Sequence, residues 1–262
     1  MLGFADSGLL LPELDLSQSL RDRFFREAEA CSRIEHENVV DIIDFDEAPE
    51  GELFMVMEKL EGLDVATRLR TREAIGPDAL IRWFVEVCDA VSAAHRLGIV
   101  HRDLKPANLF LQQRGGREVV KVLDFGLAKF RAEAGHTTSG AMMGTPYYMA
   151  PEQIEGEGEA VGPETDIFAL GCILYELITG RVAFAGKSIA QIAYQIVHGD
   201  RPTLPADRYP SLQPVLDRCL KQDPAERYAT VDALREGFLA AVDAEDELPT
   251  LPPAGASELP TL

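Results

Sequence analysis

Apolar residues recur at helical spacing in two long stretches of the chain. Phe24, Ala28 and Cys31 are separated by four and three residues, which predicts a helix over about residues 17–34. A second stripe begins after Pro77, a residue type favoured in the first turn of a helix, and predicts a longer helix. Its apolar face contains Leu80, Trp83, Phe84, Val87, Val91 and Ala94.

A third stretch, residues 167–175, is apolar on every side, which is typical of a helix buried within a domain. Gly180 follows it as the expected helix stop. Shorter helices fit three later stretches, which are residues 187–198, 211–221 and 230–243. The second half of the chain is therefore predicted to be mainly helical.

Strand-like patterns are fewer and lie in the first half of the chain. Residues 39–43 and 53–57 are rich in β-branched and long apolar side chains and are separated by a turn-like segment. A hairpin is predicted over residues 109–123, with its turn at Gly115 and Gly116.

These elements predict an α+β protein with three regions. Residues 1–60 combine one helix with two strands, residues 61–243 form a larger helical part, and residues 244–262 form a tail. The tail is rich in Pro, Glu and Thr and repeats ELPTL, so it has little to bury and is predicted to be disordered. A linear-motif or phosphate-acceptor role for Thr250 and Thr261 is the alternative for these repeats.

Acidic residues outnumber basic ones, 44 Asp and Glu against 25 Lys and Arg, so the formal net charge is −19. Proteins bind DNA and RNA largely by neutralising phosphates with Lys and Arg, so this balance argues against nucleic-acid partners. The N-terminus carries Asp6 and Glu13 and no basic stretch, and therefore does not resemble a signal peptide. Apolar runs fall well short of the roughly 18 residues that span a bilayer, so we expect no membrane segment.

The four cysteines are widely spaced and form no C-x-x-C pair; they are Cys31, Cys88, Cys172 and Cys219. This spacing indicates neither a disulfide framework nor a zinc site. Buried free thiols are the simplest interpretation. Together with the absence of a signal peptide, they predict a reducing, cytoplasmic location.

Four short motifs occur in a fixed order. Residues 101–108 read HRDLKPAN and join the long helix to the hairpin, and residues 124–126 read DFG on the far side of the hairpin. Residues 144–146 read GTP and residues 150–152 read APE. DFG alone is a weak signal, but the eight-residue string matches the protein-kinase catalytic loop at every defined position.

With these motifs in this order, the chain resembles the eukaryotic-like protein kinases, and among them the bacterial serine/threonine kinases, over about residues 9–243. The resemblance implies a bilobal α+β kinase fold with a largely helical large lobe. It also implies transfer of the γ-phosphoryl group of ATP, with Mg²⁺, to Ser or Thr hydroxyls of protein substrates. The alternative is a pseudokinase, which has the same fold but serves as a protein-binding module.

Phosphoryl transfer needs a proton acceptor, positive charge near the γ-phosphate and oxygen ligands for Mg²⁺. The resemblance assigns Asp103 as the proton acceptor, Lys105 as the γ-phosphate contact, and Asn108 and Asp124 as the metal ligands. Asn108 and Asp124 stand at opposite ends of the predicted hairpin, which brings them together. Without catalysis, Asp103 and Lys105 would form a surface ion pair and Asp124 would be a turn or cap residue.

The nucleotide-binding positions come from the same resemblance. Glu27 matches the glutamate that pairs with the ATP-anchoring lysine, although it could be one more solvated charge on its helix. Met57 resembles the gatekeeper residue, and Glu58 and Leu60 resemble the hinge whose backbone meets adenine. Asp64 lies where an acid often contacts the ribose, with a helix cap as the alternative.

Other residues resemble structural supports of the kinase site. Glu152 and Arg227 match a buried ion pair of the family, and Asp166 matches an acid on the central helix that braces the catalytic loop. His101 is expected to pack and to form hydrogen bonds rather than to act as an acid or base.

Two positions indicate the acceptor class. Lys105 in the catalytic loop and Thr145 in GTPYYMAPE follow the Ser/Thr kinase pattern. Arg102 precedes Asp103, as in kinases that are activated by phosphorylation of the loop between DFG and APE. Candidate acceptors in that loop are Thr137, Thr138 and Ser139, whose polarity is also ordinary for a flexible loop.

Two parts of the kinase pattern have no counterpart in this sequence. There is no G-x-G-x-x-G motif, and no lysine precedes Lys59; the family's spacing from Glu27 places the missing lysine at Gly8. We therefore expect a truncated small lobe with an uncovered sheet edge, an orphaned Glu27, and weak activity or poor expression of residues 1–262 taken alone.

Overall fold

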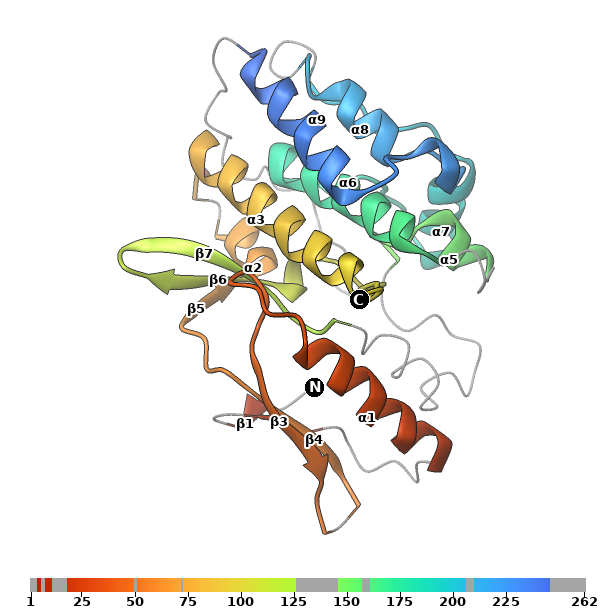
Figure 1. The fold of residues 1–262 in the computed structure, drawn as a ribbon. Helices are drawn as coiled ribbons and strands as arrows, with labels where there is room; N and C mark the ends of the chain where they lie inside the picture. The colour runs from red at the N-terminus through yellow and green to blue at the C-terminus, as the bar shows by residue number, and fades with distance from the viewer. Residues whose placement is uncertain are drawn as a thin grey trace.

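The computed structural model describes residues 4–5, 8–10, 18–49, 51–71, 73–125, 146–156, 161–205 and 210–245. Its elements fall into two groups, with a small sheet and α1 (Gln18–Ser32) at one end and a cluster of helices at the other (Figure 1). A second sheet lies between them. The predicted α+β architecture is confirmed; the assignment of residues 1–60 to the small lobe remains a prediction.

The small sheet has four antiparallel strands in the order β1-β2-β4-β3. They are β1 (Phe4–Ala5), β2 (Gly8–Leu10), β3 (Ile42–Glu47) and β4 (Leu53–Met57). The expectation of two strands with an uncovered edge was wrong, because β2 pairs with β4 along the edge that we expected to be open. Gly8, the position at which the kinase pattern expects a lysine, lies opposite Val56.

The first predicted strand is shifted along the chain. We expected it over residues 39–43, but β3 begins at Ile42. Val39 and Val40 instead contact the second sheet, where the Val40 N–H donates to the Val122 carbonyl over 3.1 Å. Their apolar pattern therefore reflects burial between the two sheets.

Helix α1 packs its apolar stripe against the small sheet. Phe24 and Ala28 form a compact core with Leu53 and Met55, and all four are buried. At the other end of the helix, Cys31 belongs to the larger core of the protein. The helix therefore links the small sheet to the rest of the protein.

The second sheet contains three strands in sequence order, which are β5 (Gly62–Asp64), β6 (Leu109–Arg114) and β7 (Arg117–Val122). The hairpin β6–β7 confirms the prediction. Its two turn residues, Gly115 and Gly116, have φ values of 59° and 81°, which residues with a side chain rarely adopt.

The helices of the large group are α2 (Val65–Arg70), α3 (Pro77–Arg96), α5 (Pro151–Glu155), α6 (Pro163–Thr179), α7 (Ile189–His198), α8 (Gln213–Cys219) and α9 (Val231–Asp243). Helix α6 is buried almost throughout, as its apolar sequence predicted, and packs against α3 and α8. Gly171 gives α6 room for this contact, since a Cβ there would lie 2.6 Å from the Cys219 Cβ. The catalytic-loop sequence leaves the C-terminal end of α3 toward β6 (Figure 1).

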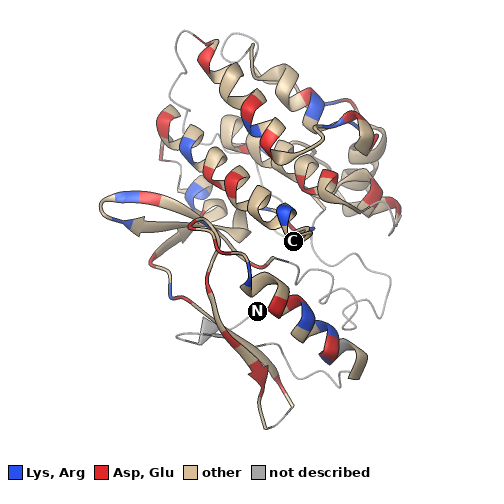
Figure 2. Cartoon of the chain, in the orientation of Figure 1, with Lys and Arg blue, Asp and Glu red and all other residues tan. Residues whose placement is uncertain are grey.

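Acidic residues are spread over both groups of elements (Figure 2). On β3 they form an exposed row of Asp44, Asp46 and Glu47. Within the described residues, none of the helices has both the length and the hydrophobicity to span a bilayer.

Candidate active site

The loop at residues 101–108 is held from behind by one buried carboxylate. Asp166, on α6, accepts hydrogen bonds from the backbone N–H groups of His101 and Arg102, each at 2.8 Å. It also bonds to the His95 side chain at 2.8 Å. Arg102 adopts φ 67°, a conformation that a non-glycine residue holds only where its surroundings impose it. Asp166 thus has the bracing geometry that the resemblance implied.

Three of the predicted catalytic residues meet at one carboxylate. The Lys105 Nζ lies 2.7 Å from the Asp103 Oδ2, and the Asn108 Nδ2 lies 3.3 Å from the same oxygen. Asn108 also donates to the Asp103 carbonyl over 2.8 Å. Asp103 and Lys105 are both partly exposed, with side-chain exposures of 31% and 37%. Both side-chain contacts thus fall on Oδ2 of the Asp103 carboxylate.

The hairpin brings Asn108 next to the DFG segment, as predicted. The Leu123 N–H donates to the Asn108 carbonyl over 2.9 Å, and Asp124 follows directly. Asp124 has φ 58°, so, like Arg102, it is a non-glycine residue with a left-handed backbone. Asn108 and Asp124, whose side chains both carry oxygen atoms, therefore lie close together in the backbone at the two ends of the hairpin.

His101 is fully buried beside this segment. Its Nδ1 accepts the Asp103 N–H at 3.3 Å, and its Nε2 lies 2.8 Å from the Leu123 carbonyl. These contacts fit a neutral imidazole with its proton on Nε2. Its ring also packs on Phe125, with a centroid distance of 4.8 Å. Both contacts agree with a packing and hydrogen-bonding role.

Glu27 is not orphaned in the structure. Its Oε1 accepts a hydrogen bond from the Arg23 Nε, one helical turn earlier, at 3.0 Å. The other oxygen, Oε2, is buried and has no hydrogen-bond partner among the described residues. Glu27 thus forms an ion pair with Arg23, although the lysine that the kinase pattern expects at position 8 is a glycine.

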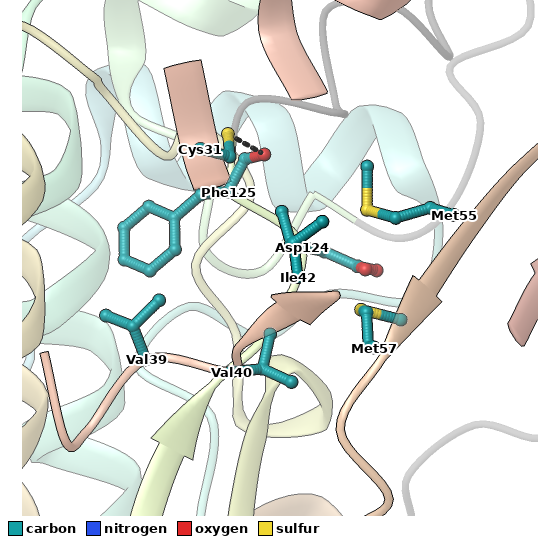
Figure 3. Close-up of a pocket in the computed structure, with 8 residues that line it drawn as sticks. All are labelled: Cys31, Val39, Val40, Ile42, Met55, Met57, Asp124 and Phe125. Atoms are coloured by element: carbon teal, nitrogen blue, oxygen red, sulfur yellow. Dashed lines mark hydrogen bonds between the residues drawn. The ribbon is translucent and has the colours of Figure 1, made fainter. Parts of the chain in front are cut away.

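A small apolar cavity lies where α1, β3 and β4 meet the DFG segment (Figure 3). It is lined by Cys31, Val39, Val40, Ile42, Met55, Met57, Asp124 and Phe125. Its volume is only about 10 Å³, roughly the space for a single water molecule. The Cys31 Sγ lies 3.0 Å from the Phe125 carbonyl, so α1 contacts the DFG segment directly. Burial, reinforced by the charges of Glu27 and Asp124, raises the pKa of Cys31 to about 12.

The predicted hinge leaves β4 at Met57, which lines this cavity. The Glu58 N–H donates to the Asp41 carbonyl over 2.9 Å. Within the described part of the chain, no hydrogen bond occupies the Glu58 carbonyl. The Glu58 side chain turns toward Lys121, at 2.5 Å.

Asp64 caps α2. Its Oδ1 accepts the Thr67 N–H at 2.8 Å, and its Oδ2 accepts the Thr67 hydroxyl at 2.7 Å. Of the two roles left open by the sequence, the cap is the one that the structure forms. A ribose contact by Asp64 stays a prediction.

The predicted ion pair between Glu152 and Arg227 is present and almost wholly buried. The Arg227 Nη1 and Nη2 each lie 2.8 Å from a different oxygen of Glu152. Burial acts to raise the pKa of Glu152, but the hydrogen bonds and charge of Arg227 outweigh it and lower that pKa. Gln153, the next residue of α5, donates to the Arg102 carbonyl over 2.9 Å and ties this region to the catalytic loop.

The remaining candidate residues lie outside the described part of the chain. These are Thr137, Thr138, Ser139 and Thr145. The same holds for the predicted tail beyond residue 245.

Lys121 and Arg23 were missed by the sequence reasoning. Lys121 interrupts the run Val119, Val120, Val122 in a strand that is buried on both sides, and a lysine in such a run signals a buried charge. Arg23 lies four residues before Glu27, the spacing at which helical side chains meet.

The fold and this site together define a protein-kinase catalytic domain. The sequence matches the protein kinase domain family over residues 12–239, and the chain belongs to that family. Members of the family use ATP and Mg²⁺.

Two similar bacterial proteins support the serine/threonine kinase branch. The chain is 41% identical over 241 residues to the serine/threonine-protein kinase Pkn1 of Myxococcus xanthus. It is 35% identical over 240 residues to the serine/threonine-protein kinase PknB of Mycolicibacterium smegmatis. These matches cover 89% and 88% of this chain but only 34% and 37% of the relatives, so the chain spans about a third of their length. The predicted resemblance is confirmed.

A solved structure supports the fold. The crystal structure of a mutant PknI kinase domain from Mycobacterium tuberculosis matches with a TM-score of 0.69 and 24% sequence identity. The match covers 91% of this chain and 86% of that one. The predicted bilobal kinase fold is confirmed.

Proposed function

We propose that this chain is the catalytic part of a protein serine/threonine kinase, which transfers the γ-phosphoryl group of ATP to Ser or Thr hydroxyls of proteins. Family membership supports the reaction class. One observation carries the proposal: the Asp103 carboxylate is contacted by both Lys105 and Asn108, and Asn108 lies next to the segment that contains Asp124.

Asp103 is the proton acceptor in this proposal. Lys105 and Asn108 both bond to its Oδ2, which fixes the rotation of the carboxylate and directs Oδ1 to the incoming hydroxyl. A general base of this kind contributes about 10²- to 10⁴-fold to the rate. The Lys105 ammonium also lies where it can neutralise charge that develops on the transferred group.

Asn108 and Asp124 fit the requirements of a magnesium site. Both offer oxygen ligands, which Mg²⁺ prefers, and both are placed by the same hairpin. Magnesium in such sites neutralises charge on the phosphates of the nucleotide. The left-handed backbone of Asp124 turns its side chain toward β4, on the side of Met57 (Figure 3).

The adenine would meet the Glu58 carbonyl and the backbone of Leu60. The Glu58 N–H is already engaged by Asp41, so the carbonyl is its remaining backbone group. Asp64 stands beyond the hinge as a candidate ribose contact, although both of its oxygens already serve Thr67.

The substrates we propose are proteins with Ser or Thr acceptors, on the strength of Lys105 and Thr145. Thr137, Thr138 and Ser139 are proposed phosphate acceptors of the kinase itself. The four buried, free thiols support a reducing compartment, and we propose the cytoplasm.

The test is phosphate transfer from radiolabelled ATP with Mg²⁺ to dephosphorylated casein, together with calorimetric titration of ATP. We expect slow, Mg²⁺-dependent labelling of Ser and Thr. The Asp103→Asn variant should lose at least about 100-fold in rate while retaining ATP binding. An Asp200→Asn variant, at an exposed position away from the site, controls for loss of charge.

Two results would contradict the proposal. Equal labelling by the wild-type protein and the Asp103→Asn variant would mean that Asp103 is not the base. ATP binding without any transfer by the wild-type protein would instead support the protein-binding alternative.

A further inference from the structure

Lys121 is a buried charge that the proposed mechanism does not use. It lies on β7 between Val120 and Val122, and its side chain is 7% exposed. Burying an ammonium group is costly unless it is paired and hydrogen-bonded. Its contacts therefore require an explanation.

The ammonium joins three separate segments. Its Nζ lies 2.5 Å from the Glu58 Oε1 in the hinge and donates to the Val39 carbonyl over 3.1 Å. The same Glu58 oxygen accepts the Asp41 N–H at 3.0 Å. We call this group of Lys121, Glu58, Val39 and Asp41 the hinge clasp.

Further hydrogen bonds fix one side of the hinge clasp. Asn38 is buried, and its Nδ2 donates to the Val120 carbonyl over 2.9 Å. The Val122 N–H donates to the Asn38 carbonyl over 2.7 Å. The segment before β3 is thus secured to β7 by its backbone. The hinge is bonded to this segment through the Glu58 N–H, which donates to the Asp41 carbonyl, and directly to β7 only through the Glu58 side chain among the described contacts.

Through its contact with Glu58, Lys121 connects the predicted hinge to the strand that leads to Asp124. It precedes Asp124 by three residues on the strand that leads into the DFG segment, and Glu58 opens the predicted hinge. We propose that Lys121 is a positioning residue that fixes the distance between the hinge and Asp124, the two ends of the nucleotide site. This inference rests on the proposed function, since a nucleotide must bridge the two ends.

The hinge clasp borders an open polar pocket of about 540 Å³. Glu58 and Lys121 line this pocket together with further polar residues, among them Glu35 and Glu37. Water in this pocket can solvate Glu58, whose side chain is 24% exposed. Replacing Lys121 with methionine, which retains an unbranched stem, should therefore release the hinge without leaving a dry, unpaired carboxylate.

The experiment is calorimetric titration of wild-type and Lys121→Met protein with ATP and Mg²⁺, and separately with adenosine. ATP spans both ends of the site and should bind about tenfold more weakly to the variant. Adenosine reaches only the hinge and should lose no more than about twofold. If Lys121 only stabilised the fold, its replacement would lower the affinity for ATP and for adenosine by the same factor. Lys221→Met, at an exposed lysine, is the matched control.

Glu58→Gln is the second variant, in case Lys121→Met does not fold. It retains an acceptor for the Asp41 N–H but weakens the bond to Lys121, so it should show the same selective loss for ATP. Unchanged ATP affinity, or equal losses for ATP and adenosine, would overturn the role of Lys121 while leaving the kinase proposal intact. Failure of the wild-type protein to bind ATP would overturn both.

Discussion

Replacing Arg227 with methionine tests how the large lobe is held together. The Arg227 side chain is fully buried and forms two 2.8 Å hydrogen bonds to Glu152, whose side chain is 3% exposed. It also donates to three backbone carbonyls, those of Glu164, Lys221 and Gln222. In Arg227→Met, the Glu152 carboxylate loses its cationic partner but retains the hydroxyl contact from Thr165 at 2.8 Å.

Breaking a buried ion pair by removing one partner costs about 3–5 kcal/mol, because the remaining charge is left uncompensated. Domains have about 5–15 kcal/mol of total stability, so the variant should lose a substantial share of it. With a urea dependence of about 3 kcal/mol per molar, the midpoint should fall by about 1–2 M.

Urea unfolding followed by circular dichroism measures this change. The pKa of Glu152 is lowered in the folded protein, so the pair contributes stability above the ordinary glutamate pKa, and this is lost as pH falls through the lowered value. The difference between wild type and Arg227→Met should therefore shrink below about pH 4. If Arg227→Met does not fold, Arg227→Lys, which retains the charge without the paired bonds, should give an intermediate loss.

Two comparisons make the reasoning refutable. Glu152→Leu combined with Arg227→Met removes both charges and should recover much of the lost stability. Arg96→Met breaks an exposed contact to Asp232, where the side chains are 62% and 56% exposed, and should cost less than about 1 kcal/mol. An Arg227→Met midpoint equal to that of Arg96→Met, or a double variant less stable than Arg227→Met alone, would refute the argument.

Three further predictions follow from the same contacts. Asp166→Asn leaves one backbone N–H of the catalytic loop without its acceptor, so kcat should fall about 100-fold with little change in ATP affinity; unchanged kcat would contradict this. All four cysteines are buried and Cys31 has a pKa of about 12, so a thiol reagent at neutral pH should label none within minutes and all four in guanidinium; fast native labelling would contradict this. Burial raises the pKa of Glu176 despite the Tyr148 hydrogen bond, so the contribution of Glu176 to the free energy of unfolding should fall as pH rises above about 4.5. In urea titrations, Glu176→Gln should remove this contribution, and a pH dependence equal to that of the wild type would contradict the argument.

Local patterns predicted the parts of the fold that depend on neighbouring residues. The hairpin followed from its paired glycines, and the buried helix α6 followed from a run of apolar residues. The meeting of Asn108 and the DFG segment followed because both motifs flank that hairpin. These features need no knowledge of distant contacts.

Distant partners decided the features that the sequence did not predict. The pattern at Val39 and Val40 read as a strand, yet these residues are buried against Val122, far along the chain. The short strands β1, β2 and β5 are too brief to carry a pattern of their own and form where a longer strand offers a partner.

The site itself combines local motif and distant support. Arg102 and Asp124 both hold left-handed backbone conformations, which cost about 1–3 kcal/mol each for non-glycine residues. Such conformations persist only where other contacts impose them. Asp166 supplies two of these contacts from α6, and the Asn108 carbonyl supplies another at Leu123. The motif residues carry the proposed chemistry, but their orientation depends on partners that are remote in sequence.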